Sequence, residues 1–73
     1  MSRLTPISYE KLIKKLKKIG FNFHRQGKGS HELWVRENRV IPIPKHKGKD
    51  ISKGMLKAIL NEIPITVDEF MNL

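Results

Sequence analysis

The stretch FNFHRQGKGSHELWVRENRVIPI, residues 21–43, contains three short strand-like runs separated by two turns. Polar and apolar residues alternate in the first run, 21–26, and in the second run, 31–36, which is the period of a β-strand. The intervening GKG offers a turn with positive backbone dihedrals available at two positions. In the third run, VIPI, Pro42 lacks the N–H that a central ladder requires, which predicts an edge strand. These residues predict a small antiparallel meander with one face free for helices.

The central run, HELWVR, has two possible core faces. His31, Leu33 and Val35 alternate with Glu32, Trp34 and Arg36. If Leu33 and Val35 face the core, His31 tilts toward the helices, and we expect it half-sheltered at the open end of the strand, near the start of the second helix. If Trp34 faces the core instead, His31 faces solvent. We expect three aromatic residues in the core: Phe21, Phe23 and Trp34.

Upstream of the strands, residues 8–19 show the apolar spacing of one helical face, with lysines on the others. Ser8 is a suitable N-cap, and Thr5 followed by Pro6 is a second possible start. Gly20 supplies the left-handed residue that ends a helix. The residues predict an amphipathic helix before the sheet.

Downstream of the strands, apolar residues repeat at helical spacing between residues 51 and 61, and Asp50 is a possible N-cap. Gly54 costs roughly 1 kcal/mol relative to alanine inside a helix, so we expect a close approach to the sheet or to a ligand there. Thr66 and Glu69 form a capping-box pattern, which predicts a last short helical turn.

The expected element order is helix, three strands, helix and a short helical turn, within a single domain over residues 1–73. This is an α+β protein with the element order of the double-stranded-RNA-binding-domain (dsRBD) fold. Because one fold serves many functions, the order alone does not identify the activity.

Fifteen Lys and Arg against seven Asp and Glu give the chain a formal net charge of +8. All fifteen cationic residues lie between Arg3 and Lys57. Such a balance indicates an anionic partner, with nucleic acid first and an anionic membrane surface second. Within the first helix, Lys11, Lys14, Lys15 and Lys18 form a row without interleaved acids, which favours a phosphate backbone or an acidic partner opposite. A charged solvent-exposed helix face is the simpler interpretation.

The chain has no cysteine, which excludes disulfides and thiolate zinc sites. No apolar run approaches the ~18 residues of a membrane span, and the first residues lack the pattern of a secretory signal. We therefore expect an intracellular, cytoplasmic protein. Peripheral membrane binding by the first helix is a third hypothesis, and it is disfavoured because the core needs the apolar face of that helix.

Local motifs carry a more specific resemblance. They are IGF at the end of the first helix, RQGKGSH at the first turn, IPKHKGKDISKGMLKAIL through the second helix, and the closing DEF. Together they resemble the HicA family of small prokaryotic toxins, which cleave RNA and are held inactive by HicB antitoxins. The resemblance spans roughly Tyr9 to Phe70 and implies that the histidine of the GSH triplet, His31, is catalytic. Glu32 stands where the family often has another histidine, and places a carboxylate next to His31 in the sequence.

Without the resemblance, a lone histidine such as His31 is most often solvated or at the edge of a core. The three histidines and scattered carboxylates form no zinc or magnesium pattern, so no metal and no cofactor is expected. Ser30 lacks the orienting carboxylate of a serine nucleophile. RNA cleavage needs fewer protein groups than a metal site or a serine nucleophile does, because the ribose 2'-hydroxyl is the nucleophile and a histidine can carry the proton.

A second proton carrier is less well defined. His46 precedes the second helix, where the helix dipole favours a phosphate, but it is equally well a solvated loop residue. A single-histidine mechanism in which lysine stabilises the charge is the alternative. The residues expected to bind RNA are Lys28, Gly29, Ser30, Lys45, Lys47, Lys49, Lys53, Lys14 and Lys18.

The first functional hypothesis is therefore a metal-independent endoribonuclease that cleaves mRNA with His31. The resemblance further implies neutralisation by a HicB-type antitoxin with acidic groups against the basic face. The second hypothesis is a non-catalytic RNA-binding module of the same fold, in which His31 has no chemical role.

Overall fold

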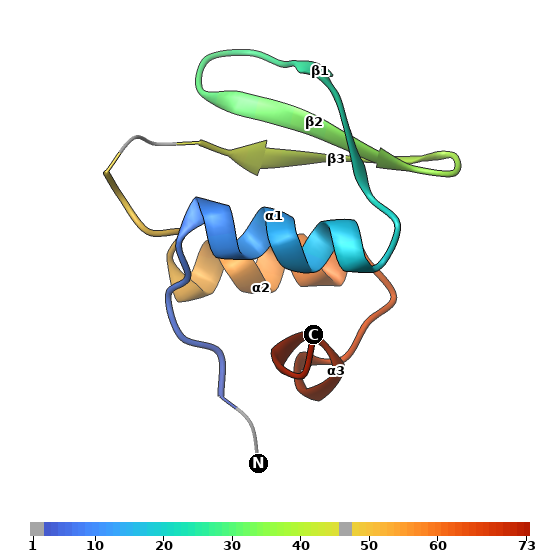
Figure 1. Cartoon of the computed structure of the whole chain (residues 1–73). Coiled ribbons are helices and arrows are strands. Elements are labelled where there is room, and N and C mark those ends of the chain that lie inside the picture. The colour runs from blue at the N-terminus through green and yellow to red at the C-terminus, as the bar shows by residue number, and fades with distance from the viewer. Residues whose placement is uncertain (1–2, 46–47) are drawn as a thin grey trace.

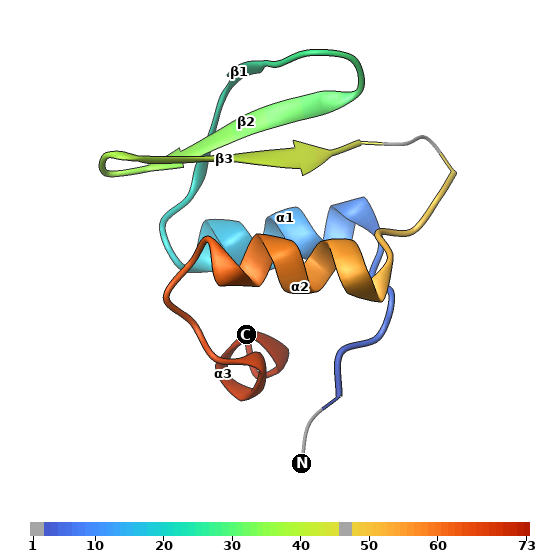
Figure 2. The ribbon, with the colours of Figure 1, turned by 180° about the vertical axis from the view of Figure 1, so that it is seen from behind.

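The computed structural model describes residues 3–45 and 48–73, and the predicted α+β order is confirmed in it. The elements are α1 (Tyr9–Lys18), β1 (Asn22–Gln26), β2 (His31–Arg36), β3 (Arg39–Pro44), α2 (Lys53–Asn61) and α3 (Val67–Met71). Both helices α1 and α2 lie on the same side of the sheet (Figures 1 and 2). This arrangement fits a dsRBD-like fold.

The sheet is antiparallel with the strand order β1-β2-β3. Strands β2 and β3 pair without interruption from His31 opposite Pro44 to Arg36 opposite Arg39. Strand β1 pairs with β2 through a register shift between Phe23 and Arg25. Strand β3 is an edge strand, as Pro42 predicts.

Helices α1 and α2 run side by side and in the same direction (Figures 1 and 2). A short bridge joins the segments that precede them, with Ile51 N donating to Ile7 O at 2.7 Å and Ile7 N donating to Ile51 O at 3.1 Å. Both helix N-termini therefore lie at the end of the molecule where β2 begins and β3 ends, which we call the lysine end. The β2–β3 turn marks the opposite end, which we call the hairpin end.

The core lies between the helices and one face of the sheet, and Trp34 belongs to it with only 2% of its surface exposed. Phe21 is fully buried, as expected, but the prediction for Phe23 was wrong, because it is 51% exposed. Phe23 packs edge-on against Trp34 at a centroid distance of 6.0 Å. It lies on an edge strand next to the register shift, so its outer side stays in solvent.

The helix boundaries follow from capping. Ser8 accepts from Lys11 N at the start of α1, and Gly20 has φ of 98°, both as predicted. The N-cap of α2 is Ser52, not Asp50, because the bridge to Ile7 holds Ile51 in an extended conformation. A Cβ on Gly54 would meet no atom within 4 Å, so the expected close approach to the sheet was wrong.

Helix α3 carries the predicted capping box, with Glu69 N donating to Thr66 Oγ1 and Thr66 N donating to Glu69 Oε1. Phe70 is fully buried in the core. The Lys15 ammonium donates to the carbonyls of Phe70 at 3.3 Å and Leu73 at 3.1 Å. Lys15 therefore fastens α3 to α1, which gives one lysine of the α1 row a structural role.

Candidate active site at the lysine end

The lysine end gathers segments that are distant in the sequence. The β1–β2 turn, the end of β3, the segment before α2 and the N-termini of both helices all lie there (Figure 1). Lys28, Lys49 and Lys53 are exposed in these segments. The N-terminus of each helix adds partial positive charge from its unpaired backbone N–H groups. Two residues predicted for this end, His46 and Lys47, lie outside the described residues.

The β1–β2 turn is held by hydrogen bonds around His31. His31 N donates to Lys28 O at 3.1 Å, and Gly27 N donates to His31 O at 3.0 Å. Gln26 Nε2 donates to Gly29 O at 3.2 Å and to His31 O at 2.9 Å. These bonds fix the turn that presents the histidine, and Gln26 is a contributor that sequence reasoning missed.

The two glycines of the turn differ in what a side chain would cost. Gly29 has φ of 59°, where only glycine avoids a steric penalty, whereas Gly27 does not use the positive region. A Cβ on Gly27 would lie 3.3 Å from Leu33 Cγ. Only one of the two available positive dihedrals is therefore used, and a side chain at Gly27 would crowd Leu33.

His31 is exposed and lies on the face of the sheet that bears no helix. Along β2 the buried residues are Glu32 and Trp34, and side chains alternate between the two faces of a strand. The expectation of a half-sheltered imidazole on the helix side was wrong. It failed because Trp34, not Leu33 and Val35, faces the core.

The orientation of the His31 ring follows from one contact. Its Nδ1 lies 3.3 Å from Lys28 O. A carbonyl only accepts hydrogen bonds, so this contact is made with Nδ1 protonated. In the neutral ring, Nε2 then carries the free lone pair. Such a nitrogen can accept a proton from a substrate hydroxyl.

Glu32 is buried on the opposite face and does not place its charge beside His31. Only 7% of its surface is exposed. The Tyr9 hydroxyl and Trp34 Nε1 donate to Oε1, the latter at 3.3 Å, and Lys45 Nζ lies 3.7 Å from Oε2. Burial, followed by the hydrogen bond to Glu32, raises the pKa of Tyr9 well above its ordinary value. Glu32 therefore links the start of α1 to the sheet.

Lys45 connects this buried cluster to the turn. Lys45 N donates to Ser30 O at 2.9 Å, while its Nζ lies 5.1 Å above the Tyr9 ring and near Glu32. The ammonium is thus directed to the helix side, and the structure does not bring it to the His31 ring. Sequence reasoning missed Tyr9 and Glu32 as partners, because nothing in the local pattern relates α1 to β2.

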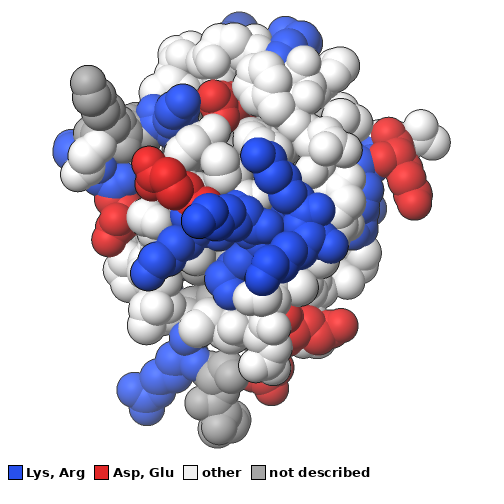
Figure 3. Space-filling model, in the orientation of Figure 1, with Lys and Arg blue, Asp and Glu red and all other residues white. Residues whose placement is uncertain are grey.

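The lysines of α1 form a separate surface. Figure 3 shows Lys and Arg side chains gathered over α1. Lys14 and Lys18 are exposed there, and Lys17 Nζ lies 5.8 Å from the Trp34 ring centroid. Since α1 covers the inner face of the sheet, Lys14 and Lys18 are on the side away from His31.

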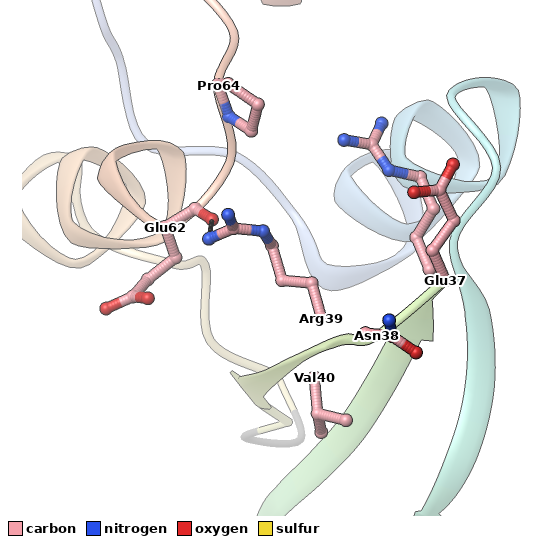
Figure 4. A pocket seen from close by; sticks show the side chains of 7 residues that line it. Glu37, Asn38, Arg39, Val40, Glu62 and Pro64 are labelled. Atoms are coloured by element: carbon pink, nitrogen blue, oxygen red, sulfur yellow. Dashed lines mark hydrogen bonds between the residues drawn. The ribbon is translucent and has the colours of Figure 1, made fainter.

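Two cavities flank the helices at opposite ends. One of about 620 Å³ lies at the lysine end, lined by Ser8, Tyr9, Glu10, Lys45, Gly48, Lys49 and Asp50. The other, of about 550 Å³, lies at the hairpin end (Figure 4). There Arg39 donates to Glu62 O at the end of α2, and Arg36 Nη1 donates to Ile19 O at the end of α1 at 3.0 Å. Both arginines thus donate to carbonyls at helix C-termini, which gives these two side chains a structural role.

Two kinds of feature are absent from the residues that the structure describes. Among residues 3–45 and 48–73, no three His, Asp or Glu side chains come together as a possible metal site. Within the same residues, no helix has the length and apolarity needed to cross a membrane.

Comparisons with known proteins identify the family. Comparison with curated proteins gives no match to the chain. The family model described as the HicA toxin of bacterial toxin-antitoxin systems matches residues 9–65. That match covers both main helices, all three strands and the turn carrying His31, so the chain belongs to the HicA toxin family.

Proposed function

We propose that this toxin is a metal-independent endoribonuclease that cleaves mRNA with His31. The observation that carries the proposal is the orientation of the imidazole, exposed beside a lysine-bearing turn with Nδ1 on the Lys28 carbonyl. Nε2 is then available to a substrate in solvent. An exposed histidine suits a polymer that lies across the surface better than a small enclosed substrate.

In the proposed reaction, the RNA supplies the nucleophile. Nε2 of His31 takes the proton of a ribose 2'-hydroxyl, whose oxygen attacks the adjacent phosphorus. The bond to the 5'-oxygen of the next nucleotide breaks, and that oxygen receives a proton. His46 is the candidate donor, with water as the alternative. The products are a 2',3'-cyclic phosphate and a 5'-hydroxyl, and no oxidant or metal is consumed.

The proposed RNA surface begins at the turn. Lys28 is exposed in the turn that carries His31, where its charge can offset that of a bound phosphate, and a Cβ on Gly29 would meet no atom within 4 Å. The helix N-termini favour phosphate at the same end. The proposed contacts at this end are Lys28, Gly29, Ser30, Lys45, Lys49 and Lys53. Lys47, which lies outside the described residues, remains a proposed contact from the sequence. Lys14 and Lys18 on α1 extend the surface to a more distant part of the strand.

The proposed partner is a HicB-type antitoxin. Membership of a toxin-antitoxin family implies a neutralising partner, and a chain of formal charge +8 favours one with acidic groups.

The reaction is tested by incubating purified protein with end-labelled RNA in excess chelator. We expect new ends with 2',3'-cyclic phosphate and 5'-hydroxyl groups, at a rate unchanged by the chelator. Products with 5'-phosphates would exclude attack by the ribose. Salt-dependent binding without new ends would support the non-catalytic RNA-binding module instead.

A further inference from the structure

Phe23 on β1 is an aromatic side chain with half of its surface in solvent. It is 51% exposed, whereas Phe21, two residues earlier, is fully buried. The Phe23 ring lies at 81° to the ring of Trp34, with 6.0 Å between the two centroids. Rings in a perpendicular pair do not stack, so at least one face of the Phe23 ring is not covered by Trp34. The contact therefore holds the ring in place and leaves it able to stack on a flat ligand.

The register shift in β1 sends Phe23 and Arg25 to opposite faces of the sheet. Residues two apart in a regular strand share a face, but the shift inserts one extra residue between these two pairings. Phe23 pairs with Trp34 and shares its helix-covered face. Arg25 pairs with Leu33 on the helix-free face. Strand β1 is an outer strand of the sheet, so a ligand that crosses its edge meets the ring on one face and the guanidinium on the other.

The chain that forms this edge carries only positive charges. From Lys11 to His31 the sequence contains seven Lys and Arg and no Asp or Glu. This stretch covers most of α1, all of β1 and the following turn, and α1 and β1 lie on the same side of the molecule (Figures 1 and 2). Lys17 Nζ lies 5.8 Å from the centroid of the Trp34 ring, so Lys17 and Phe23 contact the same indole. A ring among cations is typical of surfaces that bind unpaired nucleic-acid strands, because bases stack on the ring and phosphates meet the cations.

The edge of β1 also connects the two parts of the proposed RNA surface. Arg25 and His31 are exposed on the helix-free face. Lys14 and Lys18 are exposed on α1, on the other layer. A strand that passes from His31 along Arg25 and over the edge of β1 reaches Phe23 and then α1. This path brings cations of both layers onto one RNA molecule.

We propose that the ring of Phe23 stacks on one unpaired base of the RNA, next to a phosphate held by Lys17. This inference rests on the proposed function, because it takes RNA as the ligand. Every base has a π face, so the contact orients the strand without reading its sequence. Duplex RNA fits less well, because its bases stay stacked on one another. An acidic protein also complements the lysines, and the test separates it from RNA.

The test measures the affinity of the purified chain for an unstructured 2'-O-methyl RNA oligonucleotide, which lacks the nucleophile and stays intact. Phe23→Leu keeps an apolar side chain against Trp34 but removes the aromatic face. It is expected to weaken binding at least about 5-fold, the lower end of the effect of losing a stacking aromatic residue. The slope of log affinity against log salt should not change, because no cation is lost. Phe23→Tyr keeps the ring and should bind as tightly as the unmodified chain.

Polyphosphate and a surface variant are the controls. Inorganic polyphosphate is a polyanion without bases, so Phe23→Leu should bind it as the unmodified chain does. Met55→Ala removes an apolar side chain that is 42% exposed on α2, the helix on the β3 side, and should leave the affinity for RNA unchanged. Circular dichroism verifies that each variant folds. In the unmodified chain, the NMR signals of the Phe23 ring protons should move upfield on binding, because a stacked base shields them.

Unchanged RNA affinity in folded Phe23→Leu would overturn the proposal and leave this edge to an acidic protein. An equal loss for polyphosphate, an equal loss in Phe23→Tyr or Met55→Ala, no shift of the Phe23 ring signals, or no binding by the unmodified chain would also overturn it. Cleavage of ordinary RNA is measured separately. If the chain does not cleave RNA while Phe23→Leu weakens binding as expected, the proposed nuclease function fails and the stacking site stands.

Discussion

Glu32 is the residue that links the helix layer to the strand bearing His31. Its carboxylate is buried and accepts from Tyr9 and Trp34, with Lys45 as its charged neighbour. The Glu32→Gln substitution removes the charge of this side chain, keeps its shape and leaves Lys45 without its ion pair. The free-energy cost of such a change is on the order of 1–3 kcal/mol for a buried hydrogen-bonded carboxylate.

Tyr9 reports directly on this cluster. Its pKa is raised above the ordinary value of 10.0, so its contribution to stability is complete below pH 10 and is lost as the pH rises through the raised pKa. Because the chain has one tyrosine, the ultraviolet absorbance of phenolate follows it alone. We expect a titration midpoint well above 10.

The Glu32→Gln variant separates the two causes of that shift. Its midpoint is expected to fall toward 10 but to stay above it, because burial is the larger cause. A midpoint near 10 in the unmodified protein would contradict the buried cluster.

At this scale the sequence singles out His31 as the candidate catalytic residue, which stays a prediction, but the orientation of its side chain could not be predicted. Both alternating sets of β2 contain apolar residues, so periodicity favours neither. Glu32 is a typical surface residue type, and its burial depends on Tyr9, 23 positions earlier in the sequence. Partners from other elements are the information that a local pattern lacks.

At the scale of elements, both main helices end where an arginine from the hairpin meets them. Arg36 donates to Ile19 O and its guanidinium lies 5.0 Å from the centroid of the buried Phe21 ring. Arg39 Nη1 donates a hydrogen bond to Glu62 O at the end of α2. Cations at helix C-termini are stabilising.

Arg36→Met is therefore expected to destabilise the protein by about 1–2 kcal/mol, from the lost helix-end contact and the lost cation–π contact. For a domain of this size, that is a fall in melting temperature of roughly 5–15 °C. Cleavage at low temperature should be unaffected. The matched control is Arg25→Met, an exposed arginine on β1. Equal melting temperatures for the two variants would refute the role of Arg36.

Helix α3 depends on its capping box in a pH-dependent way. The hydrogen bond from Thr66 N lowers the pKa of Glu69 below its ordinary value of 4.5. The stabilisation that the ionised Glu69 gives to the cap is therefore complete above pH 4.5 and is lost as the pH falls through the lowered pKa. We expect lower amide-exchange protection factors in α3 in acid, each taken relative to the intrinsic exchange rate at that pH. Glu69→Ala, which removes the acceptor, should show those lower protection factors already at neutral pH. Equal protection in both proteins at neutral pH would be inconsistent with this cap.

Element types and order could be predicted, since they follow from periodicity and from glycine and proline positions. The start of α2 could not. Asp50 and Ser52 are both good capping residues, and the choice depends on the pairing of Ile51 with Ile7.

For the whole molecule, the parallel arrangement of α1 and α2 gives the charge distribution a direction. Both N-termini lie at the lysine end with His31, and both C-termini meet arginines at the hairpin end. The sequence predicts Lys14 and Lys18 as RNA-binding residues. It does not predict that α1 places them on the opposite layer from His31. Their separation follows from three-dimensional packing alone.

The α1 lysines should therefore contribute to RNA affinity but not to the chemical step. Lys14→Gln combined with Lys18→Gln is expected to weaken RNA binding and to reduce the slope of log affinity against log salt by roughly 1–2. Cleavage at saturating RNA should be unchanged. Lys57→Gln, an exposed change on α2, is the control. An unaltered salt slope in the double variant would exclude α1 from the RNA surface.

The role of His31 is tested most directly by comparing two exposed histidines, His31 at the turn and His24 on β1. RNA cleavage, RNA affinity and melting temperature are measured for His31→Ala and His24→Ala. The account predicts that His31→Ala loses at least about 100-fold in cleavage rate, as expected for a lost general base, with affinity and melting temperature unchanged, while His24→Ala cleaves normally. A folded His31→Ala protein that cleaves RNA at the unmodified rate would contradict it.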